Sequence, residues 1–156
     1  MIYRPFVLED GPKICAWRYD GAYAIYNLPP FEEIQKQNLG FGAPEKAVNY
    51  LVFCEGEDVL GFVNLLDEGE QVFLGIGVAP ERCGQGLGQQ MIKDAMTVAR
   101  QRHGEKPVYL EVRTWNARAI ACYQQAGFQI TGQIRETTCI GDGEFYVMHY
   151  HGVTPA

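Results

Sequence analysis

The sequence predicts a mixed α/β (α+β) fold, with one central sheet of about seven strands and four helices packed on its faces. Apolar runs of strand length recur through the chain and are bounded by glycine, proline or acidic turns. Apolar residues return at helical spacing after a glycine-rich turn, at Leu87, Met91, Ala95 and Val98. The chain has 156 residues, of which 47% are hydrophobic, so one domain over residues 1–156 is expected.

The elements follow one another without repeats or low-complexity linkers. Strands are expected at residues 2–8, 48–54, 59–66, 71–78, 108–112, 128–138 and 144–150. Helices are expected at residues 10–19, 31–37, 87–103 and 117–126, the first capped by Asp10. A loop is expected at residues 40–44, and the last two strands should form a hairpin around residues 141–143.

Composition excludes several classes of protein. The net charge is −6, so the chain lacks the basic surface typical of nucleic-acid binding, and no apolar run approaches the ~20 residues of a membrane span. No basic and apolar leader precedes the first strand, which favours a cytoplasmic location. The five cysteines are scattered without a Cys-x-x-Cys pair, and the histidines do not gather with them, so reduced thiols and no metal site are expected.

The most informative segment is Val78-Ala79-Pro80-Glu81-Arg82-Cys83-Gly84-Gln85-Gly86-Leu87-Gly88. An apolar strand leads into alternating glycines, and a helix follows at once. Exposed backbone amides at a helix N-terminus favour an anion, which predicts a phosphate cradle. The alternative is a tight strand-to-helix connection with no ligand.

Two common phosphate-binding motifs do not match this segment. A Walker loop ends in Gly-Lys-Ser or Gly-Lys-Thr, whereas Gly88 is followed by two glutamines. The dinucleotide fingerprint G-x-G-x-x-G, counted from Gly84, would place its last glycine at Gln89. A nucleotide-binding domain is therefore the weaker interpretation.

The segment Cys83-Gly84-Gln85-Gly86-Leu87-Gly88 resembles the Arg/Gln-x-x-Gly-x-Gly/Ala signature of the GNAT superfamily of acyl-CoA-dependent N-acetyltransferases. A second block, Leu110 to Phe128, resembles the strand–Asn–helix–Tyr-x-x-x-Gly-Phe stretch of the same superfamily, most closely its ribosomal-protein N-terminal (alanine) acetyltransferase branch. The two blocks cover roughly residues 59–128. The resemblance implies the GNAT fold, with a sheet splayed between its fourth and fifth strands.

The resemblance also implies a binding site for acetyl-CoA, the co-substrate. Contacts with the pantetheine arm are expected at Ile76, Gly77 and Val78. The residues expected to hold the pyrophosphate are Gly84, Gln85, Gly86, Leu87, Gly88 and Gln89. Independently, Gly75 and Gly77 interrupt a strand interior, which indicates a bulge or a close approach by a ligand; room for a bulky neighbour is the less favoured interpretation.

Two residues of the second block are assigned roles near the thiol. Asn116 is a residue type that caps helices, and the resemblance adds a contact with the cofactor arm. Tyr123 follows two helical turns later on the same side, where the superfamily places the proton donor to the departing thiolate. The alternative for Tyr123 is a core aromatic residue.

Glu111 is the candidate base that removes a proton from the acceptor amine. It matches the glutamate of the ribosomal-protein branch, and its alternative is a solvent-facing charge on an alternating strand; Glu70 is the reserve candidate. Cys83 departs from the usual Arg or Gln, which we interpret as a small residue tolerated in a turn. The aromatic residues between Trp17 and Phe31 either line the acceptor side or belong to the core.

Together these features predict an N-acetyltransferase in which a primary amine attacks acetyl-CoA directly in a ternary complex. The acceptor is an amine-bearing small molecule or a peptide or protein N-terminus, with no nucleic-acid or membrane partner, and the chain is a monomer or homodimer. The alternative is a non-catalytic CoA-binding or regulatory module with the same fold.

Overall fold

The computed structural model describes residues 1–138 and 141–152. It contains the seven expected strands. They are β1 (Ile2–Pro5), β2 (Tyr50–Glu55), β3 (Asp58–Asp67), β4 (Val72–Val78), β5 (Val108–Arg113), β6 (Phe128–Thr138) and β7 (Gly141–Tyr150). They form one mixed sheet in the order β1-β2-β3-β4-β5-β7-β6, in which β4 and β5 are parallel.

Helical segments occupy most of the connections. The α-helices of the described residues are α1 (Asp10–Cys15), α2 (Phe31–Lys36), α3 (Pro44–Ala47), α4 (Leu87–His103) and α5 (Ala117–Gln125). Three short 3₁₀ helices join them, η1 (Gly21–Tyr26), η2 (Gly40–Gly42) and η3 (Pro80–Arg82). One α-helix more than expected is present, because α3 begins at the last residue of the expected loop and continues through residues 45–47, for which no element was predicted.

Contacts divide the chain into two compact units, each described separately below. The first unit comprises Met1–Asn64 and Ile76–Leu87, and the second comprises Leu65–Gly75 and Gly88–Ala156. The expected single domain over residues 1–156 remains a prediction, and residues 139–140 and 153–156, including Cys139, lie outside the described residues.

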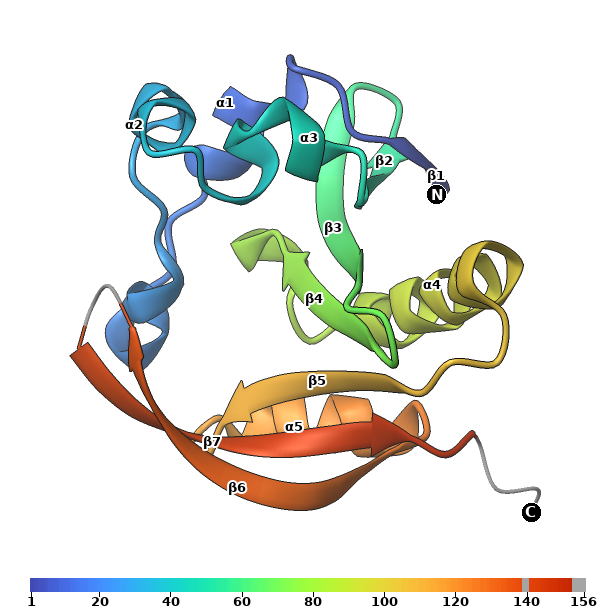
Figure 1. Ribbon diagram of the computed structural model, residues 1–156. Helices are drawn as coiled ribbons and strands as arrows, with labels where there is room; N and C mark the ends of the chain where they lie inside the picture. The colour runs from blue at the N-terminus through green and yellow to red at the C-terminus, as the bar shows by residue number, and fades with distance from the viewer. Residues whose placement is uncertain (139–140, 153–156) are drawn as a thin grey trace. The chain divides into compact units, whose positions relative to one another are not determined.

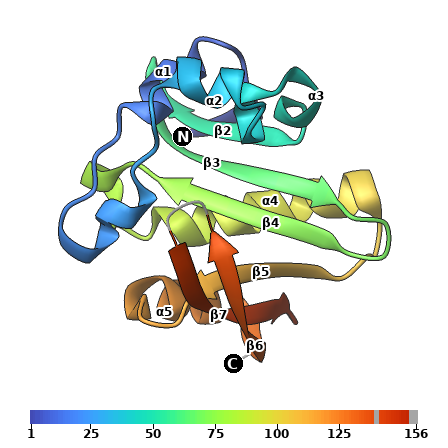
Figure 2. The ribbon, with the colours of Figure 1, turned by 60° about the vertical axis from the view of Figure 1, so that its left-hand side comes forward.

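In the first unit, α1, α2 and α3 lie together beside strands β1 to β3 (Figures 1 and 2). Buried aliphatic residues of α1, α2, β2 and β3 form its core, and a cluster of aromatic rings extends that core. The rings of this aromatic cluster belong to Phe6, Trp17, Phe31, Phe41, Tyr50 and Phe62. Trp17 stacks on Phe62 with ring centroids 6.1 Å apart. Trp17 and Phe31 are therefore partly buried and packed against this core, and a contact of their exposed parts with an acceptor stays a prediction.

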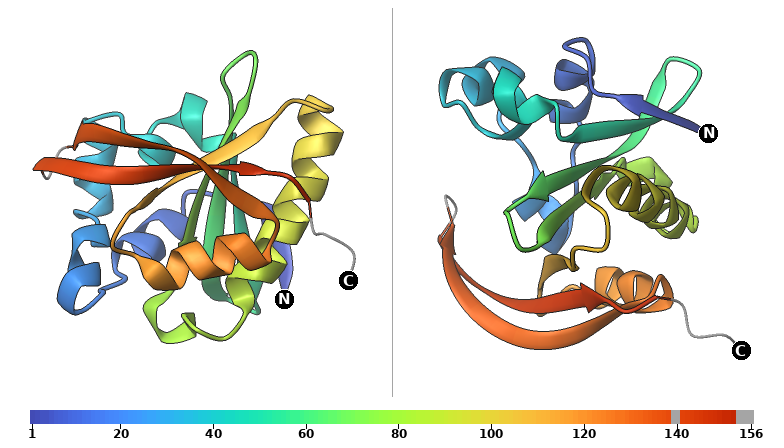
Figure 3. Two further views of the ribbon diagram at one scale, coloured as in Figure 1. Left: turned by 90° about the horizontal axis from the view of Figure 1, so that it is seen from below. Right: turned by 45° about the vertical axis from the view of Figure 1, so that its right-hand side comes forward.

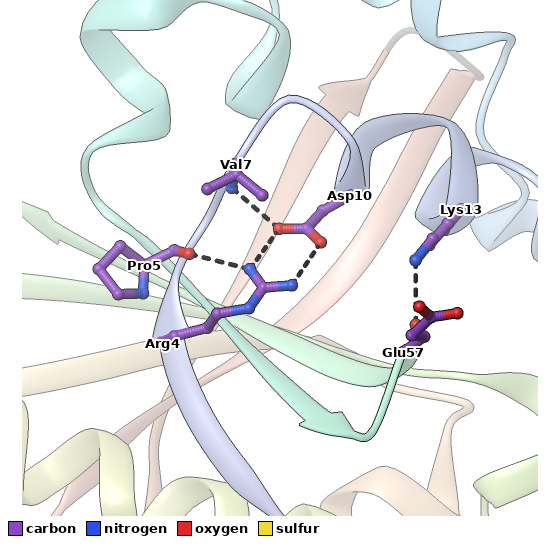
Figure 4. Close-up of polar contacts among 6 residues, drawn as sticks. All are labelled: Arg4, Pro5, Val7, Asp10, Lys13 and Glu57. Carbon is purple, nitrogen blue, oxygen red and sulfur yellow. Dashed lines mark hydrogen bonds and ion pairs between the residues drawn. The ribbon is translucent and has the colours of Figure 1, made fainter.

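The entrance to α1 is fixed by an ion pair between the partly exposed Arg4 side chain and the buried Asp10 carboxylate (Figure 4). Both oxygens of the Asp10 carboxylate accept hydrogen bonds from the Arg4 guanidinium, at 2.8 and 2.9 Å, and Oδ2 also accepts from the N–H of Val7 at 2.9 Å. The prediction that Asp10 is the N-cap was wrong by one position, since Glu9 is the N-cap and Asp10 lies in the first turn. The carboxylate fastens the preceding loop instead of capping the helix.

The first helix is shorter than predicted, ending at Cys15 and not near residue 19. The N–H of Tyr19 donates to the Asn27 side chain, and the Arg18 guanidinium donates to the carbonyl of Cys15. In a helix that continued past Cys15, the N–H of Tyr19 would donate to the carbonyl of Cys15. Here both groups have other partners, so the helix ends. Likewise the first strand ends at Pro5, and β2 starts at Tyr50 because α3 precedes it.

In the second unit, α5 lies beside the long β6–β7 hairpin, which curves along its length (Figure 3). The helix α4 buries one face, formed by Met91, Ile92, Ala95, Val98 and Ala99, as its apolar period predicts. Residues at alternate positions of β5 are buried, at Leu110 and Val112, while Glu111 between them is half-buried. Glu111 therefore lies on the opposite face of the sheet from the buried core residues.

Candidate active site

The glycine turn belongs to the first unit and has the backbone shape that glycine permits. Gly84 and Gly86 have φ values of +80° and +76°, in the left-handed region that L side chains rarely adopt. A Cβ at either position would meet no atom within 4 Å, so the backbone conformation and not crowding requires glycine there. Residues 84–86 are exposed and lead directly into α4, whose first four N–H groups have no partner within the helix. Exposed amides at this point fit a diphosphate group.

The third glycine of the turn has a different role. A Cβ at Gly88 would lie 3.1 Å from Sγ of Cys122 on α5, closer than nine in ten real contacts. Gly88 therefore permits close packing of α4 against α5 inside the second unit. The next residue, Gln89, donates a hydrogen bond from its side chain to Gln125 at the end of α5. Its backbone contact with the cofactor stays a prediction.

The end of β4 is half-buried and tightly held in the first unit. A Cβ at Gly77 would lie 2.4 Å from a ring carbon of Phe62, so this glycine makes room for a bulky neighbour. The sequence favoured the approach of a ligand at Gly77 over room for a bulky neighbour. That ranking was wrong on the side of Gly77 where a Cβ would stand, because the Phe62 ring fills this space. Contacts of Ile76, Gly77 and Val78 with a pantetheine arm stay a prediction.

Tyr19, one of the aromatic residues between Trp17 and Phe31, contacts this strand end in a way that the sequence did not predict. Its hydroxyl donates to the carbonyl of Val78 at 2.5 Å, and the thiol of Cys83 lies 3.8 Å from the same oxygen. The hydroxyl thus fixes the last residue of β4 immediately before the glycine turn. The only signal in the sequence was that Tyr19 belongs to an aromatic-rich segment, which does not indicate a particular carbonyl.

The pairing of β4 with β5 covers only the beginning of each strand. The parallel register joins Val72 to Val108 and Phe73 to Tyr109, the first two residues of both strands. The expected splay between the fourth and fifth strands stays a prediction.

Asn116 starts α5 and is buried, with 7% of its surface exposed. Its side-chain oxygen accepts a hydrogen bond from the N–H of Ala119 at 3.2 Å, so the predicted capping role is confirmed. Tyr123 lies seven residues later on α5 and is half-buried. The contact of Asn116 with a cofactor and the proton-donating role of Tyr123 remain predictions.

Glu111 lies at the centre of β5, opposite Val147 of β7. Desolvation by burial, together with a hydrogen bond to the Glu136 side chain and the charges of Glu136 and Glu68, raises the pKa of Glu111 to about 7. A carboxyl group with this pKa is half ionised near neutral pH, as a general base requires. The reserve candidate, Glu70, is exposed in the turn before β4.

The neighbouring side chain, Tyr109, is engaged with the same acidic region. Its hydroxyl donates to a carboxylate oxygen of Glu68 at 2.7 Å, and burial together with this contact raises the pKa of Tyr109. The phenol therefore stays protonated through neutral pH and acts as a hydrogen-bond donor.

Among residues 1–138 and 141–152, no three His, Cys, Asp or Glu side chains are placed to hold a metal ion. In the same part of the chain, no helix is long and apolar enough to cross a membrane.

The chain belongs to the acetyltransferase (GNAT) family, whose pattern matches residues 11–128. It is 35% identical over 81 residues to the N-alpha-acetyltransferase RimI of Mycobacterium tuberculosis, a match that covers 52% of this chain and about half (49%) of that relative. This similarity agrees with the resemblance to the ribosomal-protein branch.

Solved structures share the fold over nearly the whole chain. A chimera of the Vibrio cholerae spermidine N-acetyltransferase SpeG and hSSAT matches with a TM-score of 0.76 and 18% identity, over 96% of this chain and 95% of that one. The ribosomal-protein alanine N-acetyltransferase of Escherichia coli matches with a TM-score of 0.67 and 22% identity, over 99% and 96% of the two chains.

Proposed function

We propose that this protein transfers an acetyl group from acetyl-CoA to the α-amine of a peptide or protein N-terminus. The observation that carries the proposal is Glu111, a half-buried carboxyl group whose pKa is raised to about 7 on the face of β5 away from the core. Membership of the GNAT family supports acetyl transfer. The similar proteins include an N-alpha-acetyltransferase and a spermidine N-acetyltransferase, which suggest two acceptor classes, a protein N-terminus and a polyamine.

The pKa of Glu111 favours the first class. An α-amine has a pKa of about 7.7–8.0, so moving its proton to a group of pKa about 7 costs only about 1 kcal/mol. A lysine-like or polyamine nitrogen of pKa about 10.4 would require about 4–5 kcal/mol for the same transfer. The base that this chain offers is therefore better matched to an N-terminal amine.

Each residue then has a defined task. The amides of residues 84–89 hold the diphosphate, and the acetyl thioester supplies the activated acyl group. Glu111 accepts one proton from the acceptor ammonium, which leaves the nitrogen lone pair available. The new N–C bond forms as the C–S bond breaks, the sulfur keeps the electron pair of that bond, and the hydroxyl of Tyr123 protonates it. The nitrogen releases its second proton to solvent.

A small panel of acceptors tests this function. Thiol release from acetyl-CoA is measured with a peptide that begins with alanine, with the same peptide N-acetylated and carrying a lysine, and with spermidine. We expect kcat/KM to be highest for the peptide with the unblocked terminus. If activity is highest on spermidine, the acceptor is a polyamine and not a protein N-terminus, while the assignment as an acetyltransferase stands.

The alternative, a CoA-binding module without activity, predicts binding without thiol release. Calorimetric titration with acetyl-CoA separates the cases, because binding heat with no turnover on any acceptor favours the module. If the titration with acetyl-CoA gives no binding heat, both the acetyltransferase and the CoA-binding module are excluded.

A further inference from the structure

The Arg113 guanidinium is a charged group that the proposed chemistry does not use. Arg113 is the last residue of β5 in the second unit, and 9% of its surface is exposed. Across the part of the chain that the structure describes, its N–H donors make no hydrogen bond and no ion pair. A buried arginine is normally paired, because burial removes the water that solvates its charge. This guanidinium therefore lacks the anion that would compensate for its lost hydration.

Two residues of β7 fix the position of the guanidinium. Its central carbon, Cζ, lies 4.7 Å from the ring centroid of Phe145, the cross-strand partner of Arg113. A Cβ at Gly143 would lie 2.5 Å from Nη1 and 3.3 Å from Cζ of Arg113. The φ of Gly143 lies outside the left-handed region, so the close approach of the guanidinium, and not the backbone conformation, requires glycine there.

Stacking on the Phe145 ring leaves the hydrogen-bond donors of Arg113 unsatisfied. The ring attracts the face of the planar guanidinium, whereas the N–H bonds point outward in its plane. A carboxylate can accept two parallel hydrogen bonds along that edge while the face stays on the ring. The arrangement therefore fits a carboxylate supplied by a bound molecule.

Two carboxylates of the chain project from the same face of the sheet as Arg113. Glu111 lies two positions earlier on β5, and Glu136 of β6 is opposite Gly143, which has the same parity on β7 as Phe145. Within residues 1–138 and 141–152, neither glutamate forms an ion pair with the guanidinium. The charge of Arg113 is therefore not neutralised by these neighbours.

We propose that Arg113 is a specificity residue that binds an acidic side chain at the second or third residue of the acceptor peptide. The inference rests on the proposed function, because it places the acceptor amine at Glu111. Residues two positions apart on a strand are separated by roughly 7 Å, and an extended peptide advances by about the same distance over two residues. A peptide that runs along β5 from Glu111 therefore brings a carboxylate to the guanidinium.

Four peptides of equal length that begin with alanine test this assignment. Three carry a single glutamate, at the second, third or eighth residue, with glutamine at the other two of these positions, and the fourth carries glutamine at all three. The peptide with the distant glutamate has the composition and net charge of the first two, so it controls for overall charge. We expect the wild type to show a kcat/KM at least about tenfold higher for glutamate at the second or third residue than for the other two peptides, mainly through KM.

Substitutions of Arg113 separate carboxylate binding from packing. In Arg113→Gln, the ratio of kcat/KM between the near-glutamate and all-glutamine peptides should fall to about one. Arg113→Lys keeps the charge but not the planar fork, so it should retain part of the preference. The ratio compares two peptides on one enzyme, so a general loss of folded protein cancels.

Arg135→Gln is the matched control. Arg135 is exposed on β6 and pairs with Glu144, which has the opposite parity on β7 to Phe145. Its side chain therefore projects from the other face of the sheet, although it carries the same charge as Arg113. The ratio of kcat/KM between the two peptides should be the same in Arg135→Gln as in the wild type.

The outcomes distinguish this inference from the proposed function. Equal kcat/KM of the wild type for the near-glutamate and all-glutamine peptides, or a preference that persists in Arg113→Gln, would overturn the role of Arg113 and leave the N-terminal acetyltransferase standing. A lower Tm of Arg113→Gln without any wild-type preference would make Arg113 a packing residue.

If no peptide is acetylated, the proposed function fails, and calorimetric titration of the same peptides into the protein tests the carboxylate site by itself. Binding about tenfold tighter for near glutamate than for glutamine, with the difference lost in Arg113→Gln, supports the site. Equal binding of the two peptides, or no measurable binding of either, refutes it.

Discussion

Substitution of Gly77 by alanine tests the packing at the end of β4. The added Cβ would lie 2.4, 2.7 and 3.1 Å from three carbons of the Phe62 ring, whereas ordinary contact begins at 3.4 Å. The ring would have to move by about 1 Å, the difference between 3.4 and 2.4 Å. It has little freedom to do so, because Trp17, Phe41 and Tyr50 surround it with centroid separations of 6.1, 6.0 and 5.9 Å.

Overpacking of this kind costs about 1–3 kcal/mol, more than the 0.5–1 kcal/mol that alanine gains over glycine within a strand. We therefore expect Gly77→Ala to lower the free energy of unfolding by about 1–2 kcal/mol and Tm by roughly 2–8 °C. Urea unfolding and calorimetry at neutral pH measure both quantities.

A double substitution identifies the cause. Leucine at position 62 removes the ring carbons nearest the new methyl group, so Gly77→Ala should cost at least about 1 kcal/mol less in the Phe62→Leu background. Gly132→Ala is the control, because its Cβ would lie 4.0 Å from that of Val147 in ordinary contact, and its stability should change by less than about 0.5 kcal/mol. Additive free energies for Gly77→Ala and Phe62→Leu would refute the steric argument.

Three further predictions concern the proposed chemistry and the N-terminal ion pair. Tyr123→Phe should lower kcat about 10²–10⁴-fold with little change in acetyl-CoA affinity. The control Tyr3→Phe, at an exposed position, should change neither quantity, and an unchanged kcat in Tyr123→Phe would exclude Tyr123 from the mechanism. Gly86→Ala places a side chain at a φ of +76°, which costs about 1–2 kcal/mol. Calorimetry should then show acetyl-CoA binding weakened by roughly 5–30-fold. An unaltered affinity would contradict the proposed phosphate-binding role of the glycine turn. Burial by itself would raise the pKa of Asp10, but the hydrogen bonds from Arg4 and from the Val7 N–H, together with the charges of Arg4 and Lys13, outweigh it and lower that pKa. The contribution of Asp10 to stability is therefore full above pH about 4 and is lost as the pH falls through the folded value. The difference in free energy of unfolding between the wild type and Asp10→Asn should shrink between pH 5 and pH 2, and a constant difference would count against the ion pair.

Local sequence was sufficient where a residue's conformation depends on its chain neighbours. A tight glycine turn before α4 and a helix cap at Asn116 could be predicted, because backbone geometry and capping involve atoms only a few residues apart. The helical period of α4 likewise indicated its buried face. The end of α1 was missed, since it depends on a hydrogen bond between the N–H of Tyr19 and the side chain of Asn27, eight residues further along the chain.

The sequence by itself determined the order of the seven strands and the four predicted helices, the glycine turn and the two motif blocks that carry the family resemblance. Only the tertiary structure decided why particular residues occupy their positions. Gly77 is required by a ring fifteen positions earlier, Gly88 by a thiol on another helix, and Glu111 owes its raised pKa partly to a carboxyl group from β6. Periodicity indicates which face of a strand a residue occupies, but steric contact and the pKa of a carboxyl group depend on distances between side chains, which are set only when the strands and helices pack.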